Sequence, residues 1–346
     1  MSFNPNSIGV ANGNYFALPF NADEAALTLL PVPWDATTSY RSGTAGAPQA
    51  MLCASAQVDL FDLDCGDVWM RGIGTLPESV EIRQLGKRAR RCAEKVIALL
   101  GKGADESSAK VQPYIERVNQ ASATLNSWVR EQARQLLRRG QLVGLVGGDH
   151  STPLGYLQAL GEVHESFGVL HIDAHADLRK AYEGFEFSHA SIMYNTLKLI
   201  PSVKRLVQVG IRDLCGDEAD FAERNSLIQQ FTDYYLQERQ FNSISWAALC
   251  ERILATLPQK VYISFDIDGL SPAYCPNTGT PVPGGLSFHQ ASYLIGQLAK
   301  HGKTIVGFDL CEVSPGRNGN EWDVIVGARM LYKLCCFCLL SQPKKT

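Results

Sequence analysis

The sequence contains no apolar run of about 18 residues, the length that a membrane-spanning helix needs. It also lacks a strong excess of either charge, since 32 Lys and Arg residues stand against 35 Asp and Glu residues. Binding to nucleic-acid phosphates requires a basic surface, which this balance does not provide. The first residues lack the cationic start and apolar core of a signal peptide. We therefore expect a cytoplasmic protein with no nucleic-acid or membrane partner.

The cysteines do not form the pattern of a disulfide framework. Ten of them are scattered over 346 residues without a secretory signal, so reduced and mostly buried thiols are expected. Cys335, Cys336 and Cys338 lie in the apolar run 330–340, with no second CxxC motif elsewhere. Core packing is therefore favoured over a soft-metal site for this cluster.

Continuous apolar runs of strand length recur along the chain. They do not alternate with polar residues, which is typical of strands buried on both faces of a parallel sheet. The expected strands cover residues 27–30, 142–146, 168–172, 205–211, 261–265 and 305–310, and the main expected helices cover 82–100, 115–139, 246–257 and 288–301. This alternation predicts an α/β protein, a three-layer α/β/α sandwich around a mainly parallel sheet. We expect a single domain over residues 1–346, with the polar segment 101–112 joining two helices.

Acidic and histidine residues follow four of the expected strands. Gly-Gly-Asp-His-Ser at 147–151 follows one strand, and Asp-Ala-His-Ala-Asp at 173–177 follows the next. Asp-Ile-Asp at 266–268 and Asp-Leu-Cys-Glu at 309–312 come at the ends of the last two. Ligands of such sheets bind outside the carboxyl ends of the strands, so these side chains are expected to meet in one crevice.

The spacing within these motifs predicts a dinuclear metal site. Residues two apart in an extended chain point to the same side, so the polar residues of 173–177 are expected to aim together, as are those of 266–268. With His150 this gives two imidazoles and four carboxylates, and crowded carboxylates cannot all stay ionised without cations. Two divalent ions would balance them, and oxygen-rich ligands favour an ion such as Mn²⁺. Each fragment alone would be an ordinary turn, cap or core histidine, and only their convergence is specific.

These motifs make the sequence resemble the ureohydrolase superfamily of arginases, agmatinases and related guanidino or formimino hydrolases. The resemblance covers nearly the whole chain, from Val-Pro-Trp-Asp at 32–35 through Thr-Gly-Thr-Pro at 278–281 to Ser-Pro at 314–315. It implies an arginase-like fold, two Mn²⁺ ions per subunit, and a homotrimer or homohexamer. The implied metal ligands are His150, Asp173, Asp177 and Asp266 for one ion, and Asp173, His175, Asp266 and Asp268 for the other.

The resemblance also implies a reaction. A hydroxide between the ions attacks the guanidinium carbon, and urea and an amine are released. His189, twelve residues after the catalytic ligand Asp177, is the implied proton donor to the leaving amine, and Glu312 is the implied acceptor of the guanidinium. The alternatives are a surface-loop histidine at 189 and a salt bridge of Glu312 with Arg317 or Arg329.

Fewer residues bear on the substrate. The stretch 178–185 resembles the agmatinase-like branch, so the leading substrate is agmatine, cleaved to putrescine and urea in polyamine metabolism. In this interpretation Glu183 or Glu186 attracts the distal ammonium of agmatine, whereas Arg179 would instead suit a substrate carboxylate. Ser271 replaces an acid that is usual in the family and is expected to affect substrate choice, and segment 101–112 is a lid candidate.

Two alternatives stay open. One is another substrate, namely arginine, guanidinobutyrate, guanidine or formiminoglutamate. The other is a catalytically silent relative that keeps its ions and acts as a regulatory subunit. The presence of His189 and Glu312 beside the full ligand set weighs against the silent relative, because a protein without activity needs no proton donor.

Overall fold

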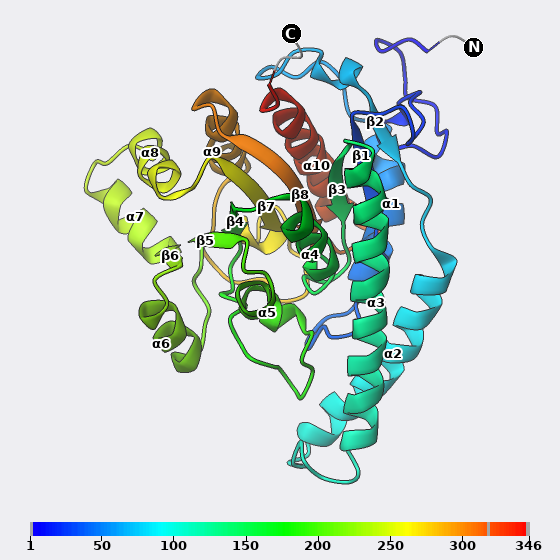
Figure 1. Ribbon diagram of the computed structural model, residues 1–346, viewed down its shortest axis with the longest axis vertical. Coiled ribbons are helices and arrows are strands. Elements are labelled where there is room, and N and C mark those ends of the chain that lie inside the picture. The colour runs from blue at the N-terminus through cyan, green and yellow to red at the C-terminus, as the bar shows by residue number, and fades with distance from the viewer. Residues whose placement is uncertain (1–2, 317–318, 344–346) are drawn as a thin grey trace.

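The computed structural model of the chain describes residues 3–316 and 319–343. These residues form one sheet of eight strands in the order β2-β1-β3-β8-β7-β4-β5-β6, with every neighbouring pair parallel (Figure 1). The strands are β1 (Leu27–Pro31), β2 (Ile73–Thr75), β3 (Leu142–Val146), β4 (Phe167–Ile172), β5 (Val203–Val209), β6 (Ile228–Phe231), β7 (Lys260–Asp266) and β8 (Thr304–Cys311). The central strands are buried almost throughout, which is why their sequences are continuously apolar.

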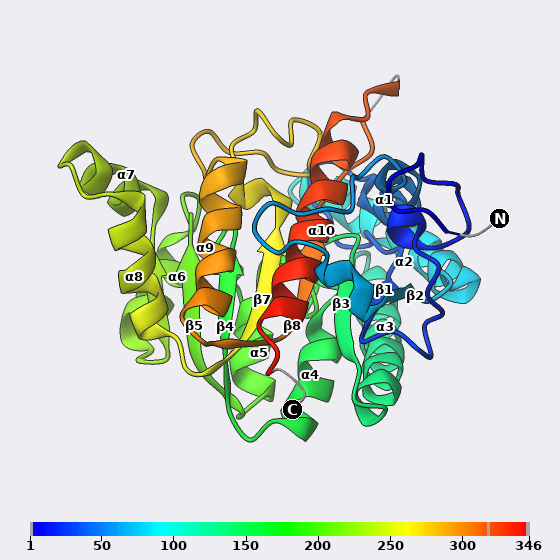
Figure 2. The ribbon, with the colours of Figure 1, turned by 90° about the horizontal axis from the view of Figure 1, so that it is seen from above.

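Helices cover both faces of the sheet, which confirms the predicted α/β/α sandwich (Figure 2). On one face lie α1 (Ala47–Ser55), α7 (Asp233–Phe241), α8 (Trp246–Thr256), α9 (Phe288–Lys300) and α10 (Trp322–Leu340). On the other lie α2 (Val80–Leu100), α3 (Gln112–Arg138), α4 (Leu154–Val163), α5 (Ile192–Leu199) and α6 (Gly216–Arg224). None of the described helices has both the length and the apolar character needed to cross a membrane.

The two edge strands were not predicted from the sequence. Strand β2 has three residues, Ile-Gly-Thr, and β6 has four, Ile-Gln-Gln-Phe. An edge strand pairs on one side only, and β6 buries only its first and last residues. Neither strand therefore needs the long apolar run that identifies a central strand.

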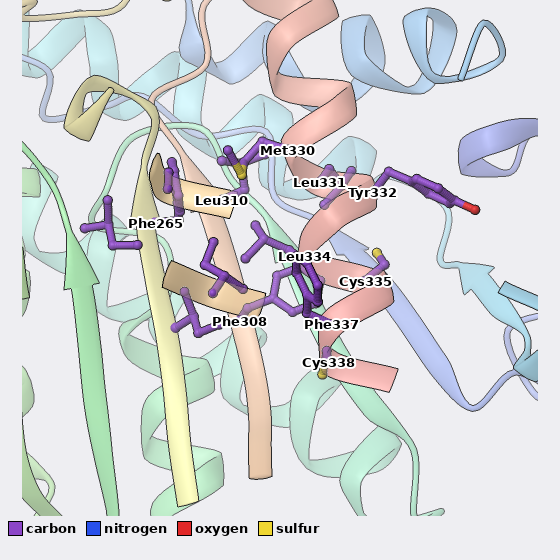
Figure 3. Packing of buried hydrophobic residues seen from close by; sticks show 14 of the residues in the cluster. Phe265, Phe308, Leu310, Met330, Leu331, Tyr332, Leu334, Cys335, Phe337 and Cys338 are labelled. Carbon is purple, nitrogen blue, oxygen red and sulfur yellow. The ribbon is translucent and has the colours of Figure 1, made fainter. Parts of the chain in front are cut away.

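Helix α10 contains the three clustered cysteines. Leu334 and Phe337 of this helix lie against Phe308 of β8 (Figure 3). Cys335 and Cys338 are fully buried in the same core, and all ten cysteines of the chain are free thiols. The cluster is therefore core packing, as predicted.

Helices α2 and α3 form a long antiparallel hairpin that projects beyond the sheet (Figure 1). The polar segment 101–112 forms the turn at its tip: residues 101–111 connect the two helices, and Gln112 is the first residue of α3. The tip has its own small core, which includes Val96, Val111 and Ile115. The hairpin is thus a packed extension of the domain rather than a loose loop.

Candidate active site

The four strands that precede the polar motifs are neighbours at the centre of the sheet, in the order β3-β8-β7-β4. Because they are parallel, their carboxyl ends meet at one edge. The loops that contain His150, Asp173, Asp268 and Glu312 all leave from this edge. Sheet topology alone therefore gathers residues that are up to 162 positions apart.

His150 is the centre of a first group of ligand atoms. Its Nδ1 atom lies 3.0 Å from Asp173 Oδ2 and 3.2 Å from Asp177 Oδ2. The same atom lies 3.4 Å from Asp266 Oδ2. Ligand atoms that share a small octahedral divalent ion lie about 3 Å apart, so these four side chains fit one ion.

A second group surrounds His175. Its Nδ1 atom lies 3.1 Å from Asp268 Oδ2 and 3.5 Å from Asp173 Oδ1. Asp173 thus directs one oxygen to each group, as a bridging carboxylate must. The other implied bridge, Asp266, instead accepts a hydrogen bond through Oδ1 from the backbone N–H of Asp268, at 2.8 Å. The structure brings all six implied ligands together and favours Asp173 as the bridge.

The electrostatics of these groups favour added positive charge. Burial raises the pKa of Asp266 well above its usual range, and burial with the nearby Asp173 raises the pKa of Asp177 to about 6. For His150 and His175 burial opposes protonation, but the surrounding carboxylates raise the pKa of both imidazoles. The cluster therefore holds its negative charge only with help from protons or cations, and its oxygen-rich donors suit hard divalent ions.

The backbone reaches this arrangement differently from the extended geometry that the spacing predicted. Strand β4 ends before Asp173, and Asp177 has a φ of +53°. After β7 the chain turns into a 3-10 helix, Ile267–Gly269. The expectation of an extended chain was therefore wrong for residues 173–177 and 267–269. The bent backbone places His175 Nδ1 3.5 Å from Asp173 Oδ1.

Further polar residues hold the ligands in place. His171 Nε2 lies 2.8 Å from Asp173 Oδ2, and Gln208 Nε2 lies 2.9 Å from His171 Nδ1. Ser264 Oγ lies 2.9 Å and Asp309 Oδ1 3.6 Å from His150 Nε2, the ring nitrogen that does not face the other candidate ligands. Such contacts fix the orientation of a ligand and are typical of metal sites.

A cavity of about 470 Å³ gives access to His175 and Asp177 from outside. His189 lines the same cavity, with Nδ1 3.3 Å from Ser188 Oγ, so its Nε2 remains available to a substrate. Desolvation, together with the charges of His175 and His150, lowers the pKa of His189 to about 3. This imidazole is therefore neutral at physiological pH.

Arg179 and Tyr182 form another wall of the cavity. The Arg179 guanidinium lies over the Tyr182 ring, 4.9 Å from its centroid, and its Nε is 3.5 Å from Glu218 Oε2. The Tyr182 ring also meets His189 edge-on, at a centroid distance of 6.0 Å. The positive charge of Arg179 is thus already opposed by a carboxylate and an aromatic face.

Glu312 lies deeper, beside the first group. Its Oε1 accepts a hydrogen bond from the backbone N–H of His150 at 2.9 Å, whereas its buried Oε2 has no partner in the described part of the chain. Its φ is +60°, and burial, followed by the charge of Asp149, raises its pKa well above the usual range. The alternative pairing with Arg329 is not formed, since that side chain bonds Ile325 O, and Arg317 lies outside the described residues.

Of the four residues predicted to bind the substrate, only Arg179 lines the cavity; Glu312 is buried below it, and Glu183 and Ser271 lie outside its lining. Glu183 lies in the turn next to Tyr182, and burial raises its pKa to about 7. Ser271 lies in the turn after the 3-10 helix, where its Oγ accepts a hydrogen bond from Ala273 N at 3.4 Å. Ser271 therefore shapes a loop beneath the site.

Two further acidic residues at the site, Asp213 and Asp149, were given no role from the sequence. Asp213 follows β5, is exposed at the cavity and has no ion pair among residues 3–316 and 319–343. It stands at the carboxyl end of an expected strand, so the rule that identified the other motifs also applied to it. Asp149 is fully buried and accepts hydrogen bonds from Thr37 N and Oγ1, while Thr37 Oγ1 accepts one from His189 N at 3.1 Å. This pairing links the His189 loop to the loop of His150.

Comparisons with known proteins agree with this geometry. The model of the arginase family matches residues 25–336. The N(1)-aminopropylagmatine ureohydrolase of Thermus thermophilus is 33% identical over 310 residues, 90% of this chain and 89% of that protein. The guanidinobutyrase of Pseudomonas aeruginosa is 28% identical over 92% of this chain and 88% of its own length. Among solved structures, proclavaminate amidino hydrolase from Streptomyces clavuligerus shares the fold with a TM-score of 0.75 at 22% identity, covering 97% of this chain and all of that one.

Proposed function

The chain belongs to the arginase family and is a metal-dependent hydrolase of guanidino compounds, and we propose that it releases urea from N1-aminopropylagmatine. This substrate is an agmatine whose amine carries an aminopropyl group, so agmatine, the substrate expected from the sequence, is its shorter analogue. The Thermus relative, whose sequence aligns with 90% of this chain, is named for its activity on N1-aminopropylagmatine, and this favours N1-aminopropylagmatine over agmatine as the substrate. Two adjoining groups of candidate ligands, of which His175 and Asp177 line the same cavity as His189, support the hydrolytic reaction.

Two Mn²⁺ ions are the proposed cofactors. One would be held by the group around His150 and the other by the group around His175, with Asp173 between them. Bound there, the ions would lower the pKa of a water molecule and supply a hydroxide nucleophile at neutral pH. A homotrimer or homohexamer in the cytoplasm, as the family resemblance implies, is part of the same proposal.

Glu312 is the proposed acceptor of the guanidinium. Its free Oε2 is buried where a planar cation can donate a hydrogen bond, and its raised pKa falls when such a cation arrives. Because Oε1 is fixed by His150 N, the carboxylate is held beside the first group of ligands. This contact orients the guanidinium carbon toward the metal-binding residues.

His189 is the proposed proton carrier. As a neutral imidazole it takes up, at Nε2, the proton that the attacking water loses. It then delivers this proton to the leaving nitrogen as the C–N bond breaks. The departing amine also takes the proton of the new C–OH group, so that an alkylammonium ion and neutral urea are released. Its place in the cavity wall, next to His175 and Asp177, suits both steps.

Asp213 is the proposed partner of the amine tail. It lies in the cavity wall, is exposed and has no described partner, whereas Arg179 is neutralised by Glu218. Arg41 also lines the cavity, so the choice of an ammonium rests on Asp213 together with the substrate named for the Thermus relative. Asp213 takes the role that the sequence analysis gave to Glu183, which does not line the cavity.

Urea release by Mn²⁺-loaded protein tests the proposal. We expect faster turnover of N1-aminopropylagmatine than of agmatine. Turnover of guanidinobutyrate and of arginine should be low. His189→Ala should lower kcat about 10²- to 10⁴-fold while both ions stay bound, and the exposed His289→Ala should match the unmodified protein. Preference for guanidinobutyrate would contradict the assignment of Asp213. No turnover of any guanidino or formimino substrate, with two ions bound, would favour the regulatory-subunit alternative.

A further inference from the structure

The tip of the α2–α3 hairpin holds a residue from the active-site loop. Phe185, four residues before His189, is fully buried in the tip core with Val96, Val111 and Ile115. Every other described residue of this tip core comes from the α2–α3 hairpin or its turn. Phe185 is the only described member that comes from another part of the chain. The loop is therefore attached to the hairpin by a large apolar side chain.

Asn119 of α3 holds the backbone on both sides of Phe185. Its Nδ2 donates a hydrogen bond to Gly184 O at 3.1 Å, and its Oδ1 accepts one from Glu186 N at 2.9 Å. One side chain thus satisfies a donor and an acceptor that helices and strands do not pair. Two simultaneous bonds fix the orientation of the loop as well as its position.

Between these contacts the loop makes a tight turn. Tyr182 and Phe185 exchange backbone hydrogen bonds of 3.1 and 2.9 Å around Glu183 and Gly184. Both central residues have positive φ, +54° and +78°, as in a type I′ turn. Glu183 seldom adopts such a conformation unassisted, and a Cβ on Gly184 would lie 2.4 Å from Ile115 Cδ1. The turn has this shape because the hairpin packs against it.

The turn is connected directly to the site. Tyr182, the partner of Phe185 in the turn, lies in the cavity wall, where its ring meets His189 and the Arg179 guanidinium. Contacts from the hairpin therefore reach the proposed proton carrier through a single turn of four residues.

We infer that the α2–α3 hairpin is a fixed platform for the His189 loop, and that Asn119 and Phe185 are positioning residues for the proton transfer proposed at His189. The inference rests on that proposed function. It replaces the lid expected at 101–112: these residues close the tip of the hairpin, and none of them lines the cavity.

Asn119→Ala tests the platform, with Thr124→Ala as the matched control. Thr124 is an exposed residue of the same helix whose Oγ1 bonds only Gln120 O within α3. We would measure kcat and KM for urea release from N1-aminopropylagmatine and agmatine, the Mn²⁺ content, and amide hydrogen exchange over residues 182–186. Phe185→Leu, which keeps an apolar side chain in the tip core, is a second variant to be examined by the same measurements.

We expect Asn119→Ala to lower kcat about 10- to 100-fold, since small displacements of a reacting group have effects of this size. KM and metal content should stay near those of Thr124→Ala, and exchange over 182–186 should become faster. Unchanged exchange would show that Asn119 does not hold the loop. Faster exchange with an unchanged kcat would show that the held loop does not serve catalysis, even if His189→Ala is inactive. If the unmodified protein turns over neither amine, the proposed substrate fails, and the exchange rates alone decide whether the hairpin is a platform.

Discussion

Asp266→Asn should make the protein less stable with metal and no less stable without it. Asp266 is 3% exposed, its Oδ2 faces His150, and burial with the charges of Asp268 and Asp173 raises its pKa. Asparagine keeps an oxygen to accept the hydrogen bond from Asp268 N but removes one buried negative charge. In the metal-free protein this removes repulsion between carboxylates, so the free energy of unfolding should hold or rise.

The metal-loaded protein should behave in the opposite way. An ion present at 100 times its Kd stabilises the folded state by about 2.7 kcal/mol, so two ions contribute about 5 kcal/mol. With an unfolding entropy of about 0.7 kcal/mol/K for 346 residues, this corresponds to a rise in Tm of about 7 °C. Asp266→Asn should lose at least half of this rise, because the first group then lacks one of its three carboxylates.

Thermal unfolding in chelator and in excess Mn²⁺, together with the metal content of each sample, provides the assay. Asp217→Asn is the control, since this exposed carboxylate lies away from both groups and its effect should not depend on metal. Equal Tm values of the unmodified protein in chelator and in Mn²⁺ would refute the metal site. An unchanged metal response of Asp266→Asn would refute the part assigned to that carboxylate.

Three shorter predictions concern other residues. Asp213→Asn should raise KM for agmatine about tenfold by removing a charged partner of the ammonium, and steady-state kinetics with guanidinobutyrate should show no such loss. Asp149→Ala should lower the free energy of unfolding by about 2–5 kcal/mol in urea, because it leaves the buried N–H and hydroxyl groups of Thr37 and Ser151 without their acceptor. A loss below about 1 kcal/mol would mean that water replaces the carboxylate. Gly148→Ala should prevent soluble expression or lower Tm and metal content together, since its Cβ would lie 1.7 Å from Trp34 O; a normal protein would show that the two loops can separate.

The sheet was predictable where burial on both faces forces a continuous apolar sequence. All six predicted strands are present within two residues of their expected ends, with the boundaries of β5, Val203–Val209, shifted furthest. The edge strands β2 and β6 and the helices α1, α4 to α7 and α10 were not among the predicted elements. Strand β6 and helix α6 bury only two residues each, so they leave a weak pattern. Helix α10 is buried on nearly all sides, so its sequence is continuously apolar and lacks the polar face that identifies a surface helix.

The gathering of the six candidate metal ligands was predictable because their residue types and strand-end positions can both be read from the sequence. Their geometry was not, since left-handed backbone at Asp177 and Glu312 has no local signal such as glycine. These conformations cost free energy and persist only where surrounding contacts hold them. For Glu312 one such contact is the hydrogen bond from His150 N, across 162 residues.

The hairpin contacts show most clearly what lies outside local sequence. Nothing around Asn119 or Phe185 marks either residue, since an asparagine on a helix and a phenylalanine near a glycine are both ordinary. Asn119 holds the active-site loop through hydrogen bonds to residues 65 and 67 positions further along the chain. No pattern in the local sequence predicts this contact between a helix and a distant loop. The polar composition of 101–112 suggested a mobile lid because exposed turns and lids have the same composition. The difference between them is the apolar core just behind the turn, to which the active-site loop contributes its own phenylalanine.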